Sequence, residues 1–281
     1  MELLLRYYRV RGVVSLAAIA ALLIGAARPL VPAGALSDVL ALLSLLGLVV
    51  ALSLLATIPI AVRHLPVRDQ ISVTSPVTGR WLALNSPIDK VPSHGVRAYG
   101  QAYAIDVVYD PADQQRPMFG TGGAMRRPTE YPAFGRPVRA MIDGEVVTAL
   151  DALRDHRARS TWLGVIYMMV EGAFRELGGP RFIIGNHITI RSDDGAYALV
   201  AHLQRGSSLV SKGERVRAGQ TIAACGNSGN TSEPHVHAQL MDRRSAWTGQ
   251  GVPIVFAGVQ IGESNDLQDG LPSNSEYLIV E

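Results

Sequence analysis

The chain has 281 residues, of which 48% are hydrophobic, a high share for a soluble protein, and the apolar excess lies at the N-terminus. Its net charge of +2 is small, and no run of interleaved basic and aromatic residues accompanies it, which argues against nucleic acid as a partner. The single cysteine, Cys225, excludes an internal disulfide and suits a small buried role.

Residues 1–66 are expected to form a membrane anchor of one or two transmembrane helices, at about 13–30 and 39–62. The second apolar run carries no charge and is long enough to cross a bilayer, which takes about 20 helical residues. The first run is marginal in length, and the arginines before it are also typical of a cleaved signal peptide. In either case the second run would still anchor the chain.

The arginines that flank the two apolar runs do not decide on which side of the membrane the rest of the chain lies. By the positive-inside rule, the arginines near the N-terminus lie in the cytoplasm. If both runs cross the membrane, the chain returns to the cytoplasm, and Arg63 and Arg68 agree with that outcome. If only the second run crosses, four arginines before it outweigh those two, and the rest of the chain lies outside.

Residues 72–262 are expected to form one mainly β domain, followed by a C-terminal tail at 263–281. From Ser75 onward, short apolar runs alternate with Gly, Pro, Asn and Asp turns, as in an antiparallel β-sandwich or barrel. The expected strands cover residues 80–84, 102–109, 144–150, 182–191, 197–203, 221–225 and 235–241.

Two insertions interrupt these expected strands. Residues 110–134 are rich in Pro, Gly and Gln, which predicts a long loop beside the site. Residues 161–177 carry apolar side chains at helical spacing, which predicts a short amphipathic helix. We expect this helix to cover an open sheet edge, with a lid or a membrane-facing element as the alternative.

The most informative residues are His235 and His237, which follow a turn rich in Gly, Asn and Ser at 226–234. If they lie on a strand, their side chains project from the same face, as two imidazoles must to share a metal or a reacting water. Imidazole is a common metal ligand and titrates near neutral pH. A solvated pair of strand histidines remains the alternative for so short a pattern.

Three short segments carry a resemblance to a known family: Tyr103-Ala104-Ile105-Asp106, Ala201-His202-Leu203 and His235-Val236-His237. In this order they resemble the lysostaphin/LytM-type zinc metallopeptidases, which cut peptide cross-links in bacterial cell walls. The resemblance covers roughly residues 75–258 and is densest at 186–242.

This resemblance implies a Zn²⁺ cofactor with His237 and Asp106 among its ligands. It also implies that His202 and His235 flank the metal's water, activate it and stabilise the oxyanion. The chemistry is consistent, because a catalytic zinc keeps one position for a water whose pKa it lowers to about 7.

One position departs from the family pattern. The family takes its third ligand from a histidine four residues before the aspartate, and that position is Ala102 here. His94 lies further back in a loop whose glycines would let it fold toward Asp106 and replace the missing ligand. Without a third ligand, the domain would be a metal-free module that binds cell-wall peptide or regulates another hydrolase. The three retained histidines favour the enzyme.

The sequence thus predicts a membrane-anchored zinc metalloendopeptidase that hydrolyses peptide bonds of peptidoglycan stem peptides or cross-bridges in bacteria. Such a substrate favours an extracytoplasmic domain, and a regulatory protein partner is left open. A carrier domain of the biotinyl/lipoyl type has similar β segments, at 137–147 and 216–222. It would need a Lys-Met pair that this chain lacks, and it would have no use for the histidines.

Overall fold

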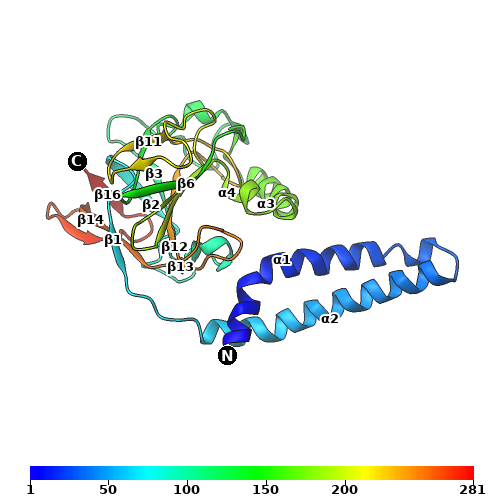
Figure 1. Cartoon of the computed structure of the whole chain (residues 1–281). Coiled ribbons are helices and arrows are strands. Elements are labelled where there is room, and N and C mark those ends of the chain that lie inside the picture. Colours follow the sequence, from blue (N-terminus) through cyan, green and yellow to red (C-terminus); the bar gives the residue numbers. More distant parts are fainter. The chain divides into compact units, whose positions relative to one another are not determined.

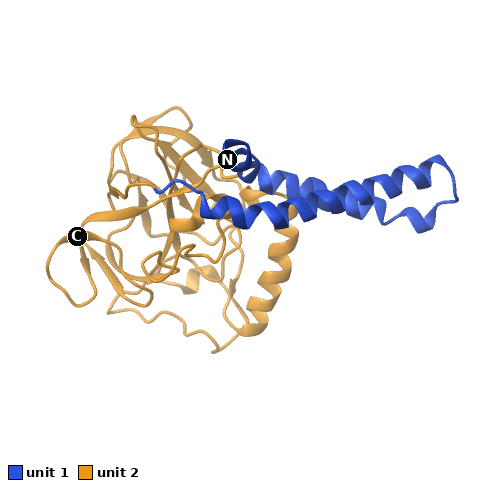
Figure 2. Ribbon diagram, turned by 90° about the horizontal axis from the view of Figure 1, so that it is seen from below, with its two compact units in different colours: residues 1–67 blue, residues 68–281 orange.

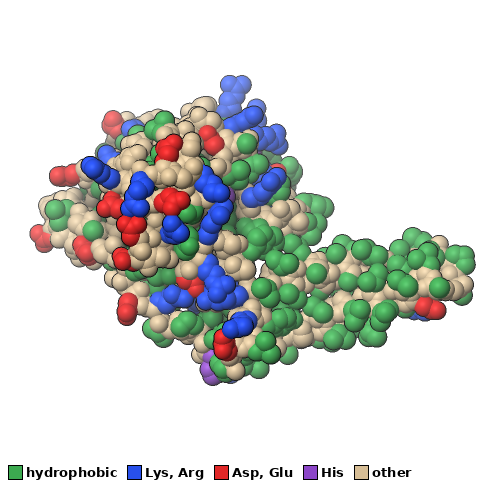
Figure 3. Space-filling view, in the orientation of Figure 1, with side chains coloured by type: hydrophobic (Ala, Val, Ile, Leu, Met, Phe, Trp, Pro, Cys, Tyr) green, Lys and Arg blue, Asp and Glu red, His purple; other side chains and the backbone are tan.

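The chain folds into two compact units, Met1–Val67 and Arg68–Glu281, in a computed structural model that describes residues 1–281 (Figure 2). The first unit is helical and the second is mainly β (Figure 1). In the space-filling view, hydrophobic side chains cover most of the helical unit, whereas Lys, Arg, Asp and Glu are spread over the β unit (Figure 3).

The helical unit is a hairpin of α1 (Glu2–Gly25) and α2 (Ala35–Arg63), joined by the short helix η1 (Arg28–Leu30). Glycines let the two helices approach closely, because a Cβ on Gly25 would collide with Ser44 and one on Gly47 would lie 2.9 Å from the Ala18 carbonyl oxygen. Both helices begin earlier than the apolar runs suggest, since charged residues at their starts are compatible with a helix. Both are long and apolar enough to cross a membrane, a test that signal sequences also pass.

The β unit is built around a sheet of twelve strands (Figure 1). Ten strands follow the order β1-β14-β16-β2-β3-β12-β9-β8-β6-β10, while β13 pairs with β12 and β15 with β14. The bounds are β1 (Ile71–Val73), β2 (Gly79–Leu84), β3 (Ile105–Tyr109), β6 (Gly144–Leu150), β8 (His187–Arg191), β9 (Tyr197–Ala201), β10 (Arg215–Val216), β12 (Val236–Met241), β13 (Gly251–Val252), β14 (Ile254–Ile261), β15 (Gln268–Gly270) and β16 (Tyr277–Val280).

Two further strand pairs complete the β structure. They are β5 (Pro137–Arg139) with β11 (Thr221–Ala224), and β4 (Met125–Arg126) with β7 (Ala158–Arg159). One hydrophobic core joins the large sheet to the β5–β11 pair, with Trp81, Phe256 and Ile222 almost fully buried. Each such side chain contributes roughly 1.5–3 kcal/mol through burial.

The mainly β fold with a short helical insertion is confirmed, but three details differ. The large sheet does not close into a barrel, and β1 pairs with β14 in parallel rather than antiparallel. Residues 263–281 are not a separate tail, because β16 lies between β14 and β2 and buries Leu278 completely.

The helical insertion is longer than expected. α3 (Trp162–Leu177) begins after Thr161, whose side chain accepts a hydrogen bond from Gly164 N. A second helix, α4 (Pro180–Ile184), replaces the first part of the strand expected at 182–191, because Pro180 suits a helix start and Gly185 ends it with φ +74°. The main contacts of α3 are with β7 and α4, so it does not cover an edge of the large sheet.

One row of directly paired residues crosses six neighbouring strands and positions the site. Paired residues on adjacent strands project from the same face of a sheet. The row runs through Leu84, Asp106, His237, Ala201, His187 and Leu150. Asp106 and His237 are therefore neighbours on one face, although 131 residues separate them in the chain.

Candidate active site

All five site residues expected from the sequence line one cleft of about 290 Å³. They come from β3, from the loop before it, from the end of β9 and from the start of β12. The five are His94, Asp106, His202, His235 and His237. The cleft also contains Met168 of α3 and Ile184 of α4, so the helical insertion forms part of its wall.

Asp106 lies at the centre of this group. Its Oδ1 atom is 2.8 Å from His237 Nδ1 and 3.6 Å from His235 Nε2. Its Oδ2 atom is 3.0 Å from His94 Nε2 and accepts a hydrogen bond from Asn85 Nδ2 at 2.8 Å. One buried carboxylate therefore meets three imidazoles.

His94 reaches Asp106 because the loop between them folds back. Tyr99 and Gly100 both adopt left-handed backbone conformations, with φ of 58° and 75°, inside the segment η2 (Ala98–Tyr103). Such conformations are easy for glycine and uncommon for tyrosine. His94 therefore lies where the fold-back hypothesis requires, while its role as a ligand remains a prediction.

Hydrogen bonds fix which nitrogen of His94 faces the carboxylate. The Ser93 hydroxyl donates to the Gln101 carbonyl at 3.2 Å, so its oxygen is free to accept from His94 Nδ1 at 2.9 Å. The proton of the neutral imidazole then sits on Nδ1. As a result, Nε2 presents a lone pair toward Asp106.

His237 is held in the same way from its other side. Gln239 Nε2 donates to the Tyr99 carbonyl at 2.9 Å, which turns Gln239 Oε1 toward His237 Nε2 at 2.8 Å. That oxygen can only accept, so the imidazole proton sits on Nε2 and the Nδ1 lone pair faces Asp106.

In their neutral forms, His94 and His237 thus direct two lone pairs at a carboxylate, an arrangement that a cation would satisfy; a further proton on either ring would instead form a hydrogen bond to Asp106. One ligand atom from each of His94, Asp106 and His237 lies within 4.8 Å of the others. Nitrogen and oxygen donors of this kind suit zinc, and three protein ligands leave a position open as catalytic zinc sites do. The residues present therefore fit the metal.

The two remaining histidines present free nitrogens to the cleft. His202 Nδ1 donates to the Ser228 carbonyl at 2.9 Å, and His235 Nδ1 donates to the Glu233 carbonyl at 2.8 Å. Their ring centroids are 4.7 Å apart. His202 adopts φ 61°, a strained backbone conformation of the kind found at functional sites. Both Nε2 atoms can therefore accept a proton.

Burial and the neighbouring charges together set the protonation of the cluster. Burial alone would raise the pKa of Asp106, but the charges of His94 and His235 and the hydrogen bonds of His237 and His94 hold it well below its usual range. Burial lowers the pKa of His202 well below the usual value, and repulsion from His235 and His237 adds to this effect. His202 is therefore a neutral imidazole near pH 7.

Burial opposes the charged form of His237 as well. The hydrogen bond to Asp106 and the negative charge of that carboxylate outweigh burial, and the pKa of His237 is raised. A cation beside Asp106 would compete with this proton, because metal binding requires a deprotonated imidazole nitrogen.

Sequence reasoning missed two groups that orient the cluster, Asn85 and Gln239. Gln239 shares a strand face with His237 at a spacing of two residues, which is a signal that could have found it. Asn85 precedes Asp106 by 21 residues and left no comparable signal. His156 was also missed: it is buried, and its Nε2 lies 2.7 Å from the Gly229 carbonyl of the loop before His235.

Residues 129–249 match the profile of peptidase family M23. This part of the chain therefore carries a peptidase M23 domain. The match includes His202, His235 and His237 but begins after His94 and Asp106. The placement of those two in the M23 site therefore rests on the distances given above.

The chain is similar to several known proteins and spans less than half the length of each of the three described next. A segment of 57 residues is 40% identical to the peptidoglycan DD-endopeptidase ShyC of Vibrio cholerae, covering 20% of this chain and 13% of that protein. Lysostaphin from Staphylococcus simulans is 21% identical with a TM-score of 0.32, covering 56% of this chain and 45% of that one. A zinc-containing peptidase from Vibrio cholerae is 18% identical with a TM-score of 0.27, covering 53% and 48%.

Proposed function

We propose that this protein is a membrane-anchored zinc metalloendopeptidase that hydrolyses peptide bonds of peptidoglycan stem peptides or cross-bridges. One observation carries the proposal: the ring nitrogens of His94 and His237 and the carboxylate of Asp106 converge in one cleft, beside the imidazoles of His202 and His235. The M23 domain match and the similarity to a peptidoglycan DD-endopeptidase support the reaction and the substrate.

The chain's own residues have separate tasks in this proposal. Zinc held by His94, Asp106 and His237 would polarise the scissile carbonyl and make a water acidic enough to attack. His202, neutral and held by the Ser228 carbonyl, accepts the proton of the attacking water at Nε2. His235 presents its Nε2 to the same cleft and can carry a proton to the leaving nitrogen.

The anchor part of the proposal depends on α1 and α2. Both are long and apolar enough to cross a membrane, although a signal sequence would satisfy the same criterion. A cell-wall substrate requires the β unit to lie outside the cytoplasm. Protease treatment of intact spheroplasts tests this side: an extracytoplasmic β unit is digested, whereas a cytoplasmic one survives until the membrane is opened.

A second candidate function is a metal-free module that binds cell-wall peptide or regulates another hydrolase. The observation in its favour is Ala102, which stands where the family pattern has a metal-binding histidine. The two candidates differ in zinc content and in hydrolysis, but not in peptide binding.

Hydrolysis of isolated peptidoglycan by the full chain in detergent separates the two candidates. The enzyme should release new amino termini, and a zinc chelator should abolish that release. His202→Ala is the matched control for contaminating hydrolases, because it should be inactive. Wild-type protein loaded with zinc that binds peptidoglycan without releasing amino termini would leave the binding module as the function.

A further inference from the structure

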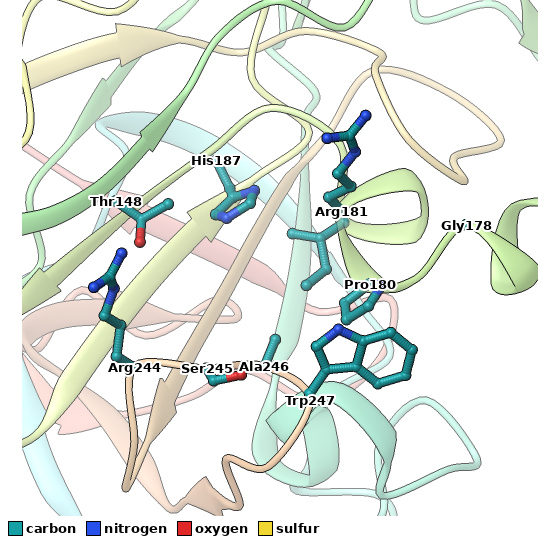
Figure 4. A pocket seen from close by; sticks show the side chains of 10 residues that line it. Thr148, Gly178, Pro180, Arg181, His187, Arg244, Ser245, Ala246 and Trp247 are labelled. Carbon is teal, nitrogen blue, oxygen red and sulfur yellow. The ribbon is translucent and has the colours of Figure 1, made fainter. Parts of the chain in front are cut away.

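A second cavity, of about 430 Å³, lies next to the candidate active site and is the larger of the two (Figure 4). It is framed by Thr148, Arg181, Ile184, His187, Arg244 and Trp247. In Figure 4, Arg244 extends toward Thr148, while Trp247 and Pro180 form the opposite wall and Arg181 rises at the rim. Ile184 also lines the active-site cleft, so the two cavities share a wall.

The charged side chains that line this cavity are all positive. Two arginines line it and no carboxylate does. Arg244 forms no ion pair, and the Arg181 guanidinium lies 4.4 Å above the Phe182 ring rather than beside an acid. An unpaired arginine with a neighbouring hydroxyl is a typical receptor for a carboxylate.

His187 and Trp247 complement this positive edge. His187 Nδ1 donates to the Gly185 carbonyl at 2.8 Å, which leaves Nε2 as an acceptor for a peptide N–H. The Trp247 ring packs against Gly179, where a Cβ would lie only 2.7 Å from it, and offers an apolar wall. The cavity therefore suits an amino-acid residue that carries a carboxylate.

The sheet register gives the distance between the two cavities. His187 pairs with Ala201, and Ala201 pairs with His237, so all three project from one face across three adjacent strands. Two strand spacings amount to about 10 Å, or roughly three residues of extended peptide. Ala201 between the two histidines is fully buried and belongs to one hydrophobic cluster with Ile184, so a substrate that reaches both cavities would cross over this shared wall.

We propose that this cavity is a carboxylate-binding subsite, in which Arg244 and Thr148 hold an acidic group of the substrate about three residues from the bond that is cut. This inference rests on the proposed peptidase function and adds a charge requirement for its substrate. It assigns Arg244 as a specificity-determining residue that takes no part in the chemistry.

The test uses two preparations of soluble peptidoglycan fragments. One is untreated, and in the other the carboxyl groups are converted to carboxamides. The full chain in detergent is compared with Arg244→Gln and with Arg243→Gln, which removes the same charge from the adjacent residue, exposed like Arg244 but outside the cavity. Wild type and Arg243→Gln should prefer the untreated fragments by about tenfold or more in kcat/KM, mainly through KM, because hydrogen bonds to charged groups are strong. Arg244→Gln should lose the preference, with its thermal stability unchanged.

The outcomes separate this subsite from the proposed reaction. If wild type hydrolyses both kinds of fragment and Arg244→Gln keeps the wild-type preference, the subsite is wrong and the peptidase stands. If wild type hydrolyses neither, the reaction is wrong, and fragment affinity decides the subsite. If wild type binds the untreated fragments with a lower Kd than the amidated ones and Arg244→Gln does not, the subsite is supported. If wild type and Arg244→Gln bind the untreated fragments with equal Kd, the subsite is overturned.

Discussion

His94 Nε2 lies 3.0 Å from Asp106 Oδ2, although the two residues are twelve positions apart in the chain. The family pattern would place a histidine at Ala102, a buried residue that is 3% exposed. The left-handed turn at Tyr99 and Gly100 brings the imidazole in from a more distant loop position instead. The three donor groups proposed for zinc thus lie within 4.8 Å of one another, although the spacing of the family pattern is absent.

Gln239 is expected to tune metal affinity without contacting the metal. Gln239→Leu removes the acceptor of His237 Nε2 and frees that ring to rotate or change tautomer. Loss of such an orienting partner typically weakens metal affinity by about 10–100-fold. Competition with a chromophoric zinc chelator measures the change. Gln239→Glu keeps an acceptor oxygen and should stay closer to wild type, and equal affinity of all three proteins would refute the role.

His202 and His237 should separate chemistry from metal binding. His202→Ala is expected to lower kcat by about 10²–10⁴-fold, because a positioned proton acceptor is removed, while zinc is retained. His237→Ala should lose zinc and activity together. Metal content and peptidoglycan hydrolysis, measured on the same preparations, check both statements. Loss of zinc from His202→Ala would show that the two roles are wrongly assigned.

Sequence periodicity located most strands of the site, and it placed His235 and His237 on one face, because alternation along a strand is a local property. What depends on long-range pairing stayed hidden. Nothing in the sequence of residues 263–281 indicates that Leu278 lies on a strand between β14 and β2, because β2 is almost 200 residues away in the chain. The strand expected at 182–191 is wrong at its start, because a short helix begins at Pro180 and ends before Gly185 there.

The candidate site divides in the same way. The resemblance supplied Asp106, His202, His235 and His237, while His94 depended on how a glycine-containing loop turns. Ser93 and Gln239 hold Nδ1 of His94 and Nε2 of His237, and these contacts decide which nitrogen of each ring faces Asp106. Tautomers follow from contacts, and contacts of this kind cannot be read from residue spacing.

Stability is expected to fall on mild acidification because of His156. Burial lowers its pKa from the usual 6.5, so the unfolded chain binds the proton more readily than the folded one. The stability it contributes is complete above pH 6.5 and is lost as the pH falls from there toward the lowered pKa. Urea unfolding at pH 7.5 and 5.5 should register a smaller loss for His156→Gln than for wild type. An equal loss in both would exclude His156 as the cause.

Gly185 supports the carbonyl that holds His202. It has φ +74°, and an added Cβ would lie 2.4 Å from the Ser228 carbonyl oxygen, the group that accepts from His202 Nδ1. Gly185→Ala should therefore lower both thermal stability and kcat while zinc is retained.

Gly195 provides the control for backbone strain, since its φ is +87° and an added Cβ would meet nothing within 4 Å. Gly195→Ala should cost only about 1–2 kcal/mol of stability from the left-handed conformation and leave kcat unchanged. If the two substitutions had the same effect on kcat, the Ser228 carbonyl would have no role in positioning His202.

The most direct test of the relocated ligand is zinc stoichiometry by elemental analysis on the full chain, beside His94→Ala. We expect about one zinc per chain in the wild type and clear loss of zinc in the variant, because two ligands alone hold the metal weakly. Full zinc content in His94→Ala would contradict the relocation. No zinc in the wild type, even after metal is supplied, would contradict the metallopeptidase itself.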